Sequence, residues 1–160
     1  MKKIINPWKD TEGYYCFGCA PQNESGLQME FYEEGDEIIS FWQPEAKYQG
    51  WFNTLHGGIQ ATLLDEICGW VIIRKLQTAG VTSKMETRYM KPIYTTGGKL
   101  TLRASIREQK RNIFIIDACI CNPGYLQQRK YGVHRIHHSG SLHGCFFKLH
   151  RFCSSPVLEN

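Results

Sequence analysis

The residues best suited to chemistry gather in one segment, residues 53–66. Two adjacent glycines, Gly57 and Gly58, stand where a long apolar stretch begins, and they would allow a substrate to approach the backbone closely. The first N–H groups of a helix have no partner within the helix, and the helix dipole favours negative charge there. A helix that starts at these glycines could therefore stabilise the oxyanion formed when a carbonyl group is attacked.

Asp65 is the second candidate, because it lies two turns into the same stretch among apolar residues. A carboxylate buried without a partner is costly, so we expect a function or a specific partner for it. Desolvation would raise the pKa of Asp65, which suits a general base or a nucleophile. A structural role, in which Asp65 caps or pairs with a neighbour, fits the same pattern. The adjoining Glu66 is an alternative catalyst, although it points about 100° away around a helix.

The spacing of these two features has a consequence for assembly. Gly57 and Asp65 are eight residues apart, which is about 12 Å along a helix. One carbonyl group cannot contact both within a single chain. If both act on one substrate, Asp65 must come from a second copy of the protein, which predicts a shared active site in a two-fold symmetric dimer.

The elements that must position these residues follow from the pattern of apolar residues. Residues 58–76 are apolar on nearly every face of a helix, so this helix must be wrapped by the rest of the protein. The pattern predicts strands at residues 27–31 and 37–43 before the helix, a loop at residues 49–55, and an antiparallel meander of strands at residues 81–90, 99–108 and 112–121. One antiparallel sheet wrapped around one central helix, an α+β fold, accommodates this order.

The overall composition is that of one globular domain, residues 1–160, with an extended lead-in at residues 1–25. Of its residues, 42% are hydrophobic and 21% are charged, as is usual for such domains. No apolar stretch is long enough to cross a bilayer, and none follows the N-terminus as a secretory signal would. The seven cysteines are irregularly spaced and are expected to be reduced thiols. We therefore expect a cytoplasmic protein with no membrane partner.

The motif at the predicted helix resembles a known signature. Residues 56–59 (HGGI) followed by residues 63–66 (LLDE) are similar to the signature of the hot-dog-fold thioesterase superfamily, especially its phenylacetate-pathway branch. Residues 16–23 (CFGCAPQN) and 81–92 (VTSKMETRYMKP) also resemble that branch, and the likeness covers roughly residues 14–122. It implies a hot-dog fold and an acyl-CoA thioesterase that acts as a homodimer or a dimer of dimers, without a metal or an organic cofactor.

The resemblance also implies roles for particular residues. By position, Gly57 would supply the oxyanion N–H, and Asp65 of the opposing subunit would activate water or attack the thioester directly. Asn53 would position the water or the carbonyl group. His56 would polarise the carbonyl group or orient the loop, and Thr82 would help to hold the water.

Coenzyme A carries phosphates, so basic residues near the entrance of the site should contact them. Lys91, Lys110 and Arg111 are the candidates, with Gly58 allowing close approach of the substrate. Each basic residue could equally be part of a solvated surface.

Two other functions remain open. One is a non-catalytic acyl-CoA-binding protein, and the other is a hot-dog enoyl-acyl hydratase or dehydratase. A hydratase needs a His and an acid placed at the α and β carbons, and the two glycines after His56 fit hydrolysis better. Trp51 and Phe52 could line an acyl pocket or an interface, so the acyl group is not predicted.

A metal site is not predicted. Cys16 and Cys19 form a single CxxC, whereas a structural zinc site needs about four ligands. No second CxxC occurs, and nothing fixes the geometry of candidate ligands among the later histidines, such as His134, His137, His138 or His143. A redox role is not expected either, because this CxxC does not start a helix.

Nucleic-acid binding is not predicted from the charge. Residues 1–121 hold 14 Lys and Arg against 14 Asp and Glu, so the excess of positive charge lies in residues 122–160, with five basic residues and one acid. Such a basic segment could contact phosphate backbones without specificity. The neutral main part of the chain and the absence of a recognised nucleic-acid motif argue against it.

Residues 123–160 depart from the family pattern. After the turn at residues 122–124, the alternation expected of a closing strand is missing, and a sheet without that strand would keep an unpaired edge. We hypothesise that a shifted reading frame produced this tail; a divergent strand near residues 145–149 is the alternative. Reading the coding DNA in its other frames near Gly124 tests the hypothesis, which is abandoned if neither frame encodes an alternating apolar strand.

Overall fold

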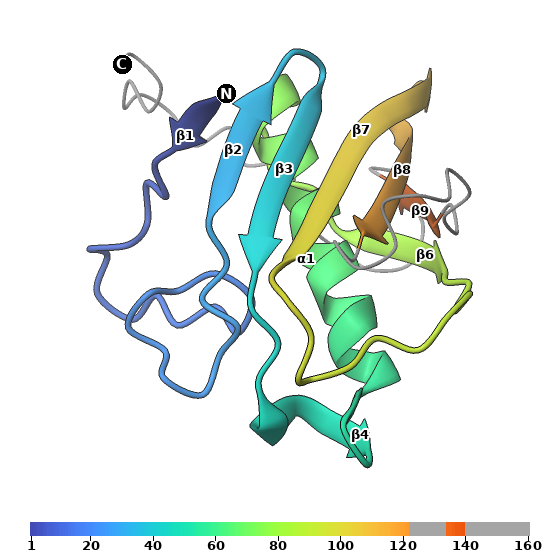
Figure 1. Ribbon diagram of the computed structural model, residues 1–160. Coiled ribbons are helices and arrows are strands. Elements are labelled where there is room, and N and C mark those ends of the chain that lie inside the picture. Colours follow the sequence, from blue (N-terminus) through green and yellow to red (C-terminus); the bar gives the residue numbers. More distant parts are fainter. Residues whose placement is uncertain (122–133, 140–160) are drawn as a thin grey trace.

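The computed structural model describes residues 1–121 and the backbone of residues 134–139, in which one sheet wraps around one helix (Figure 1). The predicted α+β hot-dog architecture is confirmed. In chain order the elements are β1 (Lys2–Ile4), β2 (Phe31–Glu34), β3 (Glu37–Trp42), a 3₁₀ turn (Ala46–Tyr48), β4 (Gln49–Trp51), β5 (Thr54–Leu55), α1 (Gly57–Leu76), β6 (Thr82–Glu86), β7 (Leu100–Lys110), β8 (Ile113–Cys121) and β9 (His134–Ser139).

The helix α1 forms the centre of the core. It packs against β3, β7 and β8, and Leu63, Leu64 and Ile67 on it are fully buried. Its C-terminal end is held by charge as well as by packing, because Arg74 and Lys75 both form ion pairs with Glu33 of β2.

One side of α1 departs from the sequence prediction that protein wraps the whole helix. A stripe at helical spacing stays partly or fully exposed in the single chain, and we call it the open stripe of α1; its residues are Gly58, Ala61, Thr62, Asp65 and Gly69. These are small or polar side chains, and the position of a Cβ at Gly69 would meet no atom within 4 Å. The prediction that the rest of this chain covers every face of the helix was therefore wrong for this stripe.

Within the described residues, the sheet has seven antiparallel strands in the order β1-β2-β3-β7-β8-β9-β6. This order corrects the predicted meander, because β6 does not lie beside β7. After α1 the chain enters β6, which lies at the far edge of the sheet. The strand that pairs with β7 on the side opposite β8 is β3 (Figure 1).

The tail supplies a strand that the sequence pattern did not reveal. β9 pairs with β8 on one side and with β6 on the other. Within the described residues, β9 is the strand that connects β6 to the rest of the sheet. The closing strand considered missing is thus present at His134–Ser139, whereas the alternative near residues 145–149 lies outside the described residues.

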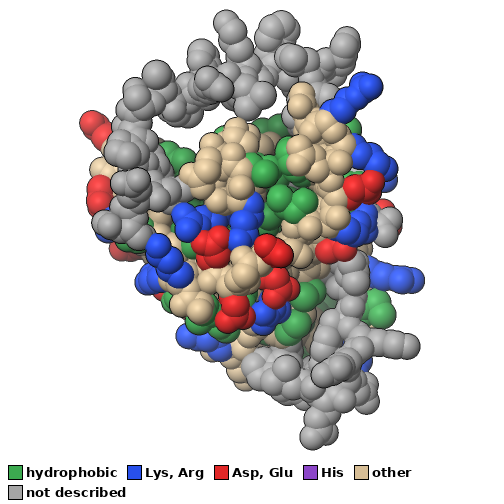
Figure 2. Space-filling view, turned by 90° about the horizontal axis from the view of Figure 1, so that it is seen from above, with side chains coloured by type: hydrophobic (Ala, Val, Ile, Leu, Met, Phe, Trp, Pro, Cys, Tyr) green, Lys and Arg blue, Asp and Glu red, His purple; other side chains and the backbone are tan. Residues whose placement is uncertain are grey.

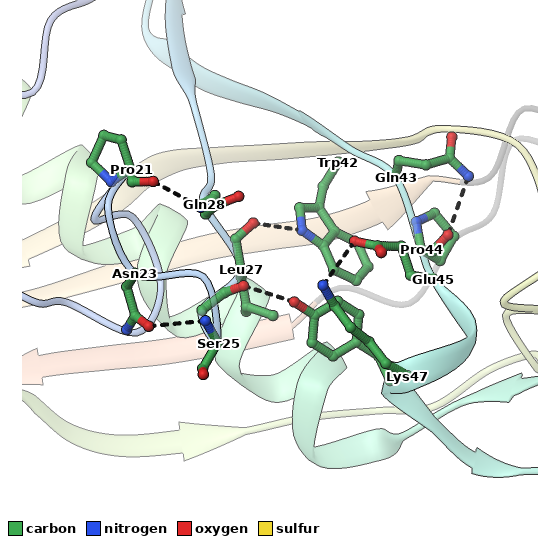
Figure 3. Close-up of polar contacts among 12 residues, drawn as sticks. Pro21, Asn23, Ser25, Leu27, Gln28, Trp42, Gln43, Pro44, Glu45 and Lys47 are labelled. Atoms are coloured by element: carbon green, nitrogen blue, oxygen red, sulfur yellow. Dashed lines mark hydrogen bonds and ion pairs between the residues drawn. The ribbon is translucent and has the colours of Figure 1, made fainter.

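Two local predictions before the helix were also inaccurate. The first strand of the predicted pair starts at Phe31 rather than at residue 27, because side chains bind the preceding backbone: Trp42 Nε1 donates to Leu27 O at 2.8 Å (Figure 3). Tyr48 likewise donates its hydroxyl to Gly26 O. The predicted loop at residues 49–55 contains the short β4–β5 hairpin.

Charges on the surface occur in pairs of opposite sign. On the face drawn in Figure 2, Lys and Arg side chains alternate with Asp and Glu. Arg103, for example, forms ion pairs with both Glu34 and Glu37. In the part of the chain that the structure describes, no helix is long and apolar enough to cross a membrane.

Shortening a core side chain of α1 should lower the free energy of unfolding. Ile67 is fully buried, so Ile67→Ala should cost about 2–5 kcal/mol, whereas the matched Ile67→Val should cost about 0.5–1.5 kcal/mol. Urea unfolding followed by circular dichroism measures both. Equal, small effects of the two changes would contradict the central packing of α1.

Candidate active site

The start of α1 leaves one backbone donor open. His56 is the N-cap residue, and its Nδ1 accepts a hydrogen bond from the Gly58 N–H at 2.9 Å. Gln60 N–H donates to His56 O. The Gly57 N–H has no hydrogen-bond partner among the described residues, so it is a donor available to a ligand at the positive end of the helix dipole.

The two glycines differ in what their surroundings require. A Cβ at Gly58 would lie 3.0 Å from His56 Nδ1, closer than comfortable contact, so the cap favours glycine there. A Cβ at Gly57 would meet only the Tyr89 ring, at 3.5 Å, an ordinary contact. Glycine at position 57 is therefore not demanded by packing within the chain.

Tyr89 is a residue of this region that the sequence analysis did not select. Its hydroxyl donates to Gly57 O at 3.0 Å, so its ring lies over the first turn of α1. The signal that could have found it is the aromatic residue shortly before Pro92 in the segment that resembles the family.

The structure brings Asp65 and Thr82 together. Thr82 lies at the start of β6, and its hydroxyl donates to Asp65 Oδ1 at 2.5 Å. Asp65 is half-buried rather than buried, because it lies on the open stripe of α1. The desolvation predicted for this carboxylate is therefore incomplete in one chain.

Asn53 lies in the β4–β5 turn, close in sequence to the helix start. Its backbone adopts the left-handed conformation, with φ of 55°, which Asn tolerates better than most residues. The Asn53 N–H donates to Gln49 Oε1, and its carbonyl accepts from the Thr95 N–H. Its exposed side chain has no partner within the described parts of the chain, so it is available to a ligand.

The three basic candidates are widely separated. Lys91 lies in the loop after β6, two residues beyond Tyr89. Lys110 and Arg111 lie at the tip of the β7–β8 hairpin, at the opposite end of the molecule from the start of α1 (Figure 1). Lys110 forms an ion pair with Glu108. One chain therefore does not bring all three beside Gly57.

Glu66, the alternative catalyst, faces away from Thr82. Its carboxylate accepts from Trp70 Nε1 at 3.2 Å and from the Cys16 thiol. Burial raises the pKa of Glu66 to about 7. Hydrogen bonding from Cys19, first from its thiol and then from its backbone, lowers the pKa of Cys16 to about 5. These groups form a second polar cluster, distinct from Asp65 and Thr82.

Known proteins share this fold. A thioesterase superfamily protein superposes with a TM-score of 0.64 at 21% identity, covering 75% of this chain and 57% of that one. A hypothetical thioesterase from Streptococcus pneumoniae TIGR4, solved with coenzyme A, gives 0.60 at 23% identity, covering 69% of this chain and 84% of that one. The PaaI protein of the E. coli phenylacetic acid degradation operon gives 0.60 at 20% identity, covering 71% and 79%. The protein is therefore a hot-dog-fold protein.

The sequence comparison finds a matching family pattern in part of the chain. Residues 52–125 match the model of the thioesterase superfamily, and this segment carries the helix start, Asp65 and Thr82. The predicted resemblance to the hot-dog thioesterase superfamily is confirmed. No curated protein matches the chain.

Removing the cap should destabilise the protein, and a matched variant separates capping from chemistry. His56→Ala should lower the free energy of unfolding by about 0.5–2 kcal/mol, and His56→Asn should recover most of this loss because Asn is a strong N-cap residue. Urea titrations measure both. If His56→Asn is as unstable as His56→Ala, the cap is not what His56 contributes to stability.

Proposed function

We propose that the protein is an acyl-CoA thioesterase of the phenylacetate-pathway type, which hydrolyses a thioester to a free acid and coenzyme A. The observation that carries this proposal is the open Gly57 N–H at the start of α1. It stands in a segment with the thioesterase superfamily pattern, and a relative of the same fold was solved with coenzyme A. This chemistry needs no metal and no organic cofactor.

In the proposed reaction, Asp65 accepts a proton from the water that attacks the thioester carbonyl carbon. Thr82 holds Asp65 Oδ1, which orients the carboxylate and leaves Oδ2 for the water. The oxyanion receives the Gly57 N–H, a type of contact whose removal costs about 10²–10³ in kcat in a known hydrolase. Collapse of the tetrahedral intermediate breaks the C–S bond, and the coenzyme A thiolate leaves and is protonated.

The site proposed here is shared between two subunits. The eight-residue separation of Gly57 and Asp65 on α1, about 12 Å, prevents both from reaching one carbonyl group from the same chain. A second copy would cover the open stripe of α1 and bring its own Asp65 to the first copy's Gly57.

Exposed apolar side chains support such an interface. Around the helix start and β6, large hydrophobic side chains are 43–80% exposed: Trp51, Phe52, Val81, Tyr89, Met90 and Tyr94. Exposed large apolar side chains, where they form a patch, are typical of interaction sites. β6 is also an edge strand, and an edge invites pairing with another chain.

The remaining predicted residues receive roles in substrate binding. The side-chain amide of Asn53 would position the water or the carbonyl group. His56 caps α1 through Nδ1, which leaves Nε2 for the substrate. Lys91 would contact coenzyme A phosphates from the same chain as Gly57, whereas Lys110 and Arg111 would reach them from the partner.

Asp65→Asn should lower kcat by about 10²–10⁴-fold, because it removes the general base while preserving shape. Release of coenzyme A from a panel of acyl-CoAs measures turnover, and calorimetry with coenzyme A should show unchanged affinity. Glu66→Gln is the control on the neighbouring carboxylate and should retain turnover. Tight binding without turnover in the wild type would indicate a binding protein, and hydration of an enoyl-CoA without thiol release would indicate a hydratase.

Mixing two inactive variants tests the shared site. Gly57→Pro removes the open N–H at the first helical position, where proline is well tolerated, and His56, at φ −58° and ψ 134°, already has the conformation that precedes proline. Gly57→Ala keeps the N–H and is the control.

Random mixing of Gly57→Pro with Asp65→Asn should restore about one quarter of wild-type activity, because half of the dimers are mixed and each has one intact site. The two variants are mixed under conditions that allow subunits to exchange. A mixture as inactive as its components would place both groups in the same chain and contradict the shared site.

A further inference from the structure

A second cluster of chemically capable side chains lies between the lead-in and α1, apart from Asp65. Cys16, Cys19 and Glu66 each offer one possible metal-ligand atom, and these atoms all lie within 4.8 Å of one another. They border a cavity of about 330 Å³ whose other walls include Trp8, Tyr14 and Trp70. The proposed thioesterase reaction uses none of these groups.

The distances suit tetrahedral coordination. The Cys16 Sγ lies 3.6 and 3.7 Å from the two Glu66 carboxylate oxygens. A tetrahedral zinc ion bound at about 2.3 Å to sulfur and about 2.0 Å to oxygen has sulfur–oxygen edges of about 3.5 Å. The edge between Cys16 and Glu66 therefore already has nearly the length that such an ion requires.

The surroundings of the two sulfurs match those of thiolate ligands. The backbone amides of Gly18 and Cys19 help to lower the pKa of the Cys16 thiol. Cys19 Sγ contacts the Tyr14 hydroxyl at 2.9 Å and receives the Asn6 side-chain amide at 3.8 Å. Donors placed on metal-bound thiolates in this way orient the ligands and stabilise their charge.

The loop is fitted closely to the carboxylate. A Cβ at Gly18 would overlap the Glu66 side chain, so any other residue there would displace this carboxylate. In the described part of the chain, Glu66 forms no ion pair with Lys or Arg. A carboxylate held among two thiols and a tryptophan lacks a positive partner that a cation would supply.

We propose that Cys16, Cys19 and Glu66 bind a zinc ion, with water completing the tetrahedron on the cavity side. Thiolate and carboxylate are both ligands that zinc takes in proteins. Glu66 points about 100° around α1 from Asp65, so the ion would fasten the lead-in to α1 rather than take part in hydrolysis. The sequence analysis predicted no metal, because the third ligand lies fifty residues from Cys16.

Metal analysis of the full chain, purified under reducing conditions, tests the proposal. The wild type should contain about one zinc per chain. Cys16→Ser, Cys19→Ser and Glu66→Gln should each reduce the bound zinc at least tenfold at equal free zinc. Cys119→Ser, which changes a half-buried thiol on β8, and the tail variant Cys145→Ser/Cys153→Ser should retain it.

Cobalt substitution of the wild type tests the ligands without depending on the folding of any variant. Zinc is first removed from the protein with a chelator, and Co²⁺ is then added. The absorption spectrum should show the visible bands of tetrahedral cobalt and the near-ultraviolet charge-transfer bands of bound thiolate. Removing zinc should also lower the melting temperature of the wild type but not that of Cys16→Ser. Absence of the thiolate bands, unchanged zinc in all three ligand variants, or a Cys16–Cys19 disulfide in the purified protein under reducing conditions would overturn the proposal.

Discussion

Burial of α1 against the sheet imposes a constraint on every polar side chain that the helix carries. Leu63, Leu64 and Ile67 have no contact with solvent, and burying aliphatic side chains of this size contributes about 1.5–3 kcal/mol each. A polar group in the same environment must find a hydrogen bond or it costs comparable free energy. The segments that surround α1 supply hydrogen bonds to several of its polar side chains.

Three polar residues of the helix have partners in three different segments of the chain. Gln60 donates to Leu55 O of β5. Asp65 accepts from Thr82 at the start of β6, and Glu66 accepts from Cys16 in the lead-in. Two of these contacts involve the groups to which we assign chemistry, so the requirement that stabilises the helix also orients its reactive carboxylates.

The position of Thr82 depends in turn on the end of the chain. β6 lies at the edge of the sheet and pairs with β9, which continues the ladder from β8. Residues 134–139 (HRIHHS) lack the alternation of apolar residues that marks a half-buried strand. Backbone pairing, which is nearly independent of side-chain type, holds this strand between its neighbours. The atypical tail thus supports the strand that orients Asp65.

The sequence by itself determined the features that arise from near neighbours. The apolar run predicted the helix to within one residue of its observed bounds, Gly57–Leu76, because helical periodicity is a local property. The two glycines indicated where backbone donors would be open, and the cap contributed by His56 then decided that Gly57, rather than Gly58, is the free donor.

Tertiary structure decided what depends on distant residues. Asp65 is less buried than predicted from the sequence, because apolar periodicity does not reveal which stripe of a helix the same chain leaves exposed. The sequence did not predict the place of β9 between β8 and β6, because strand order is set by packing of the whole sheet. Cys16 and Glu66 are fifty residues apart in the sequence, and only the folding of the lead-in onto α1 brings these side chains together.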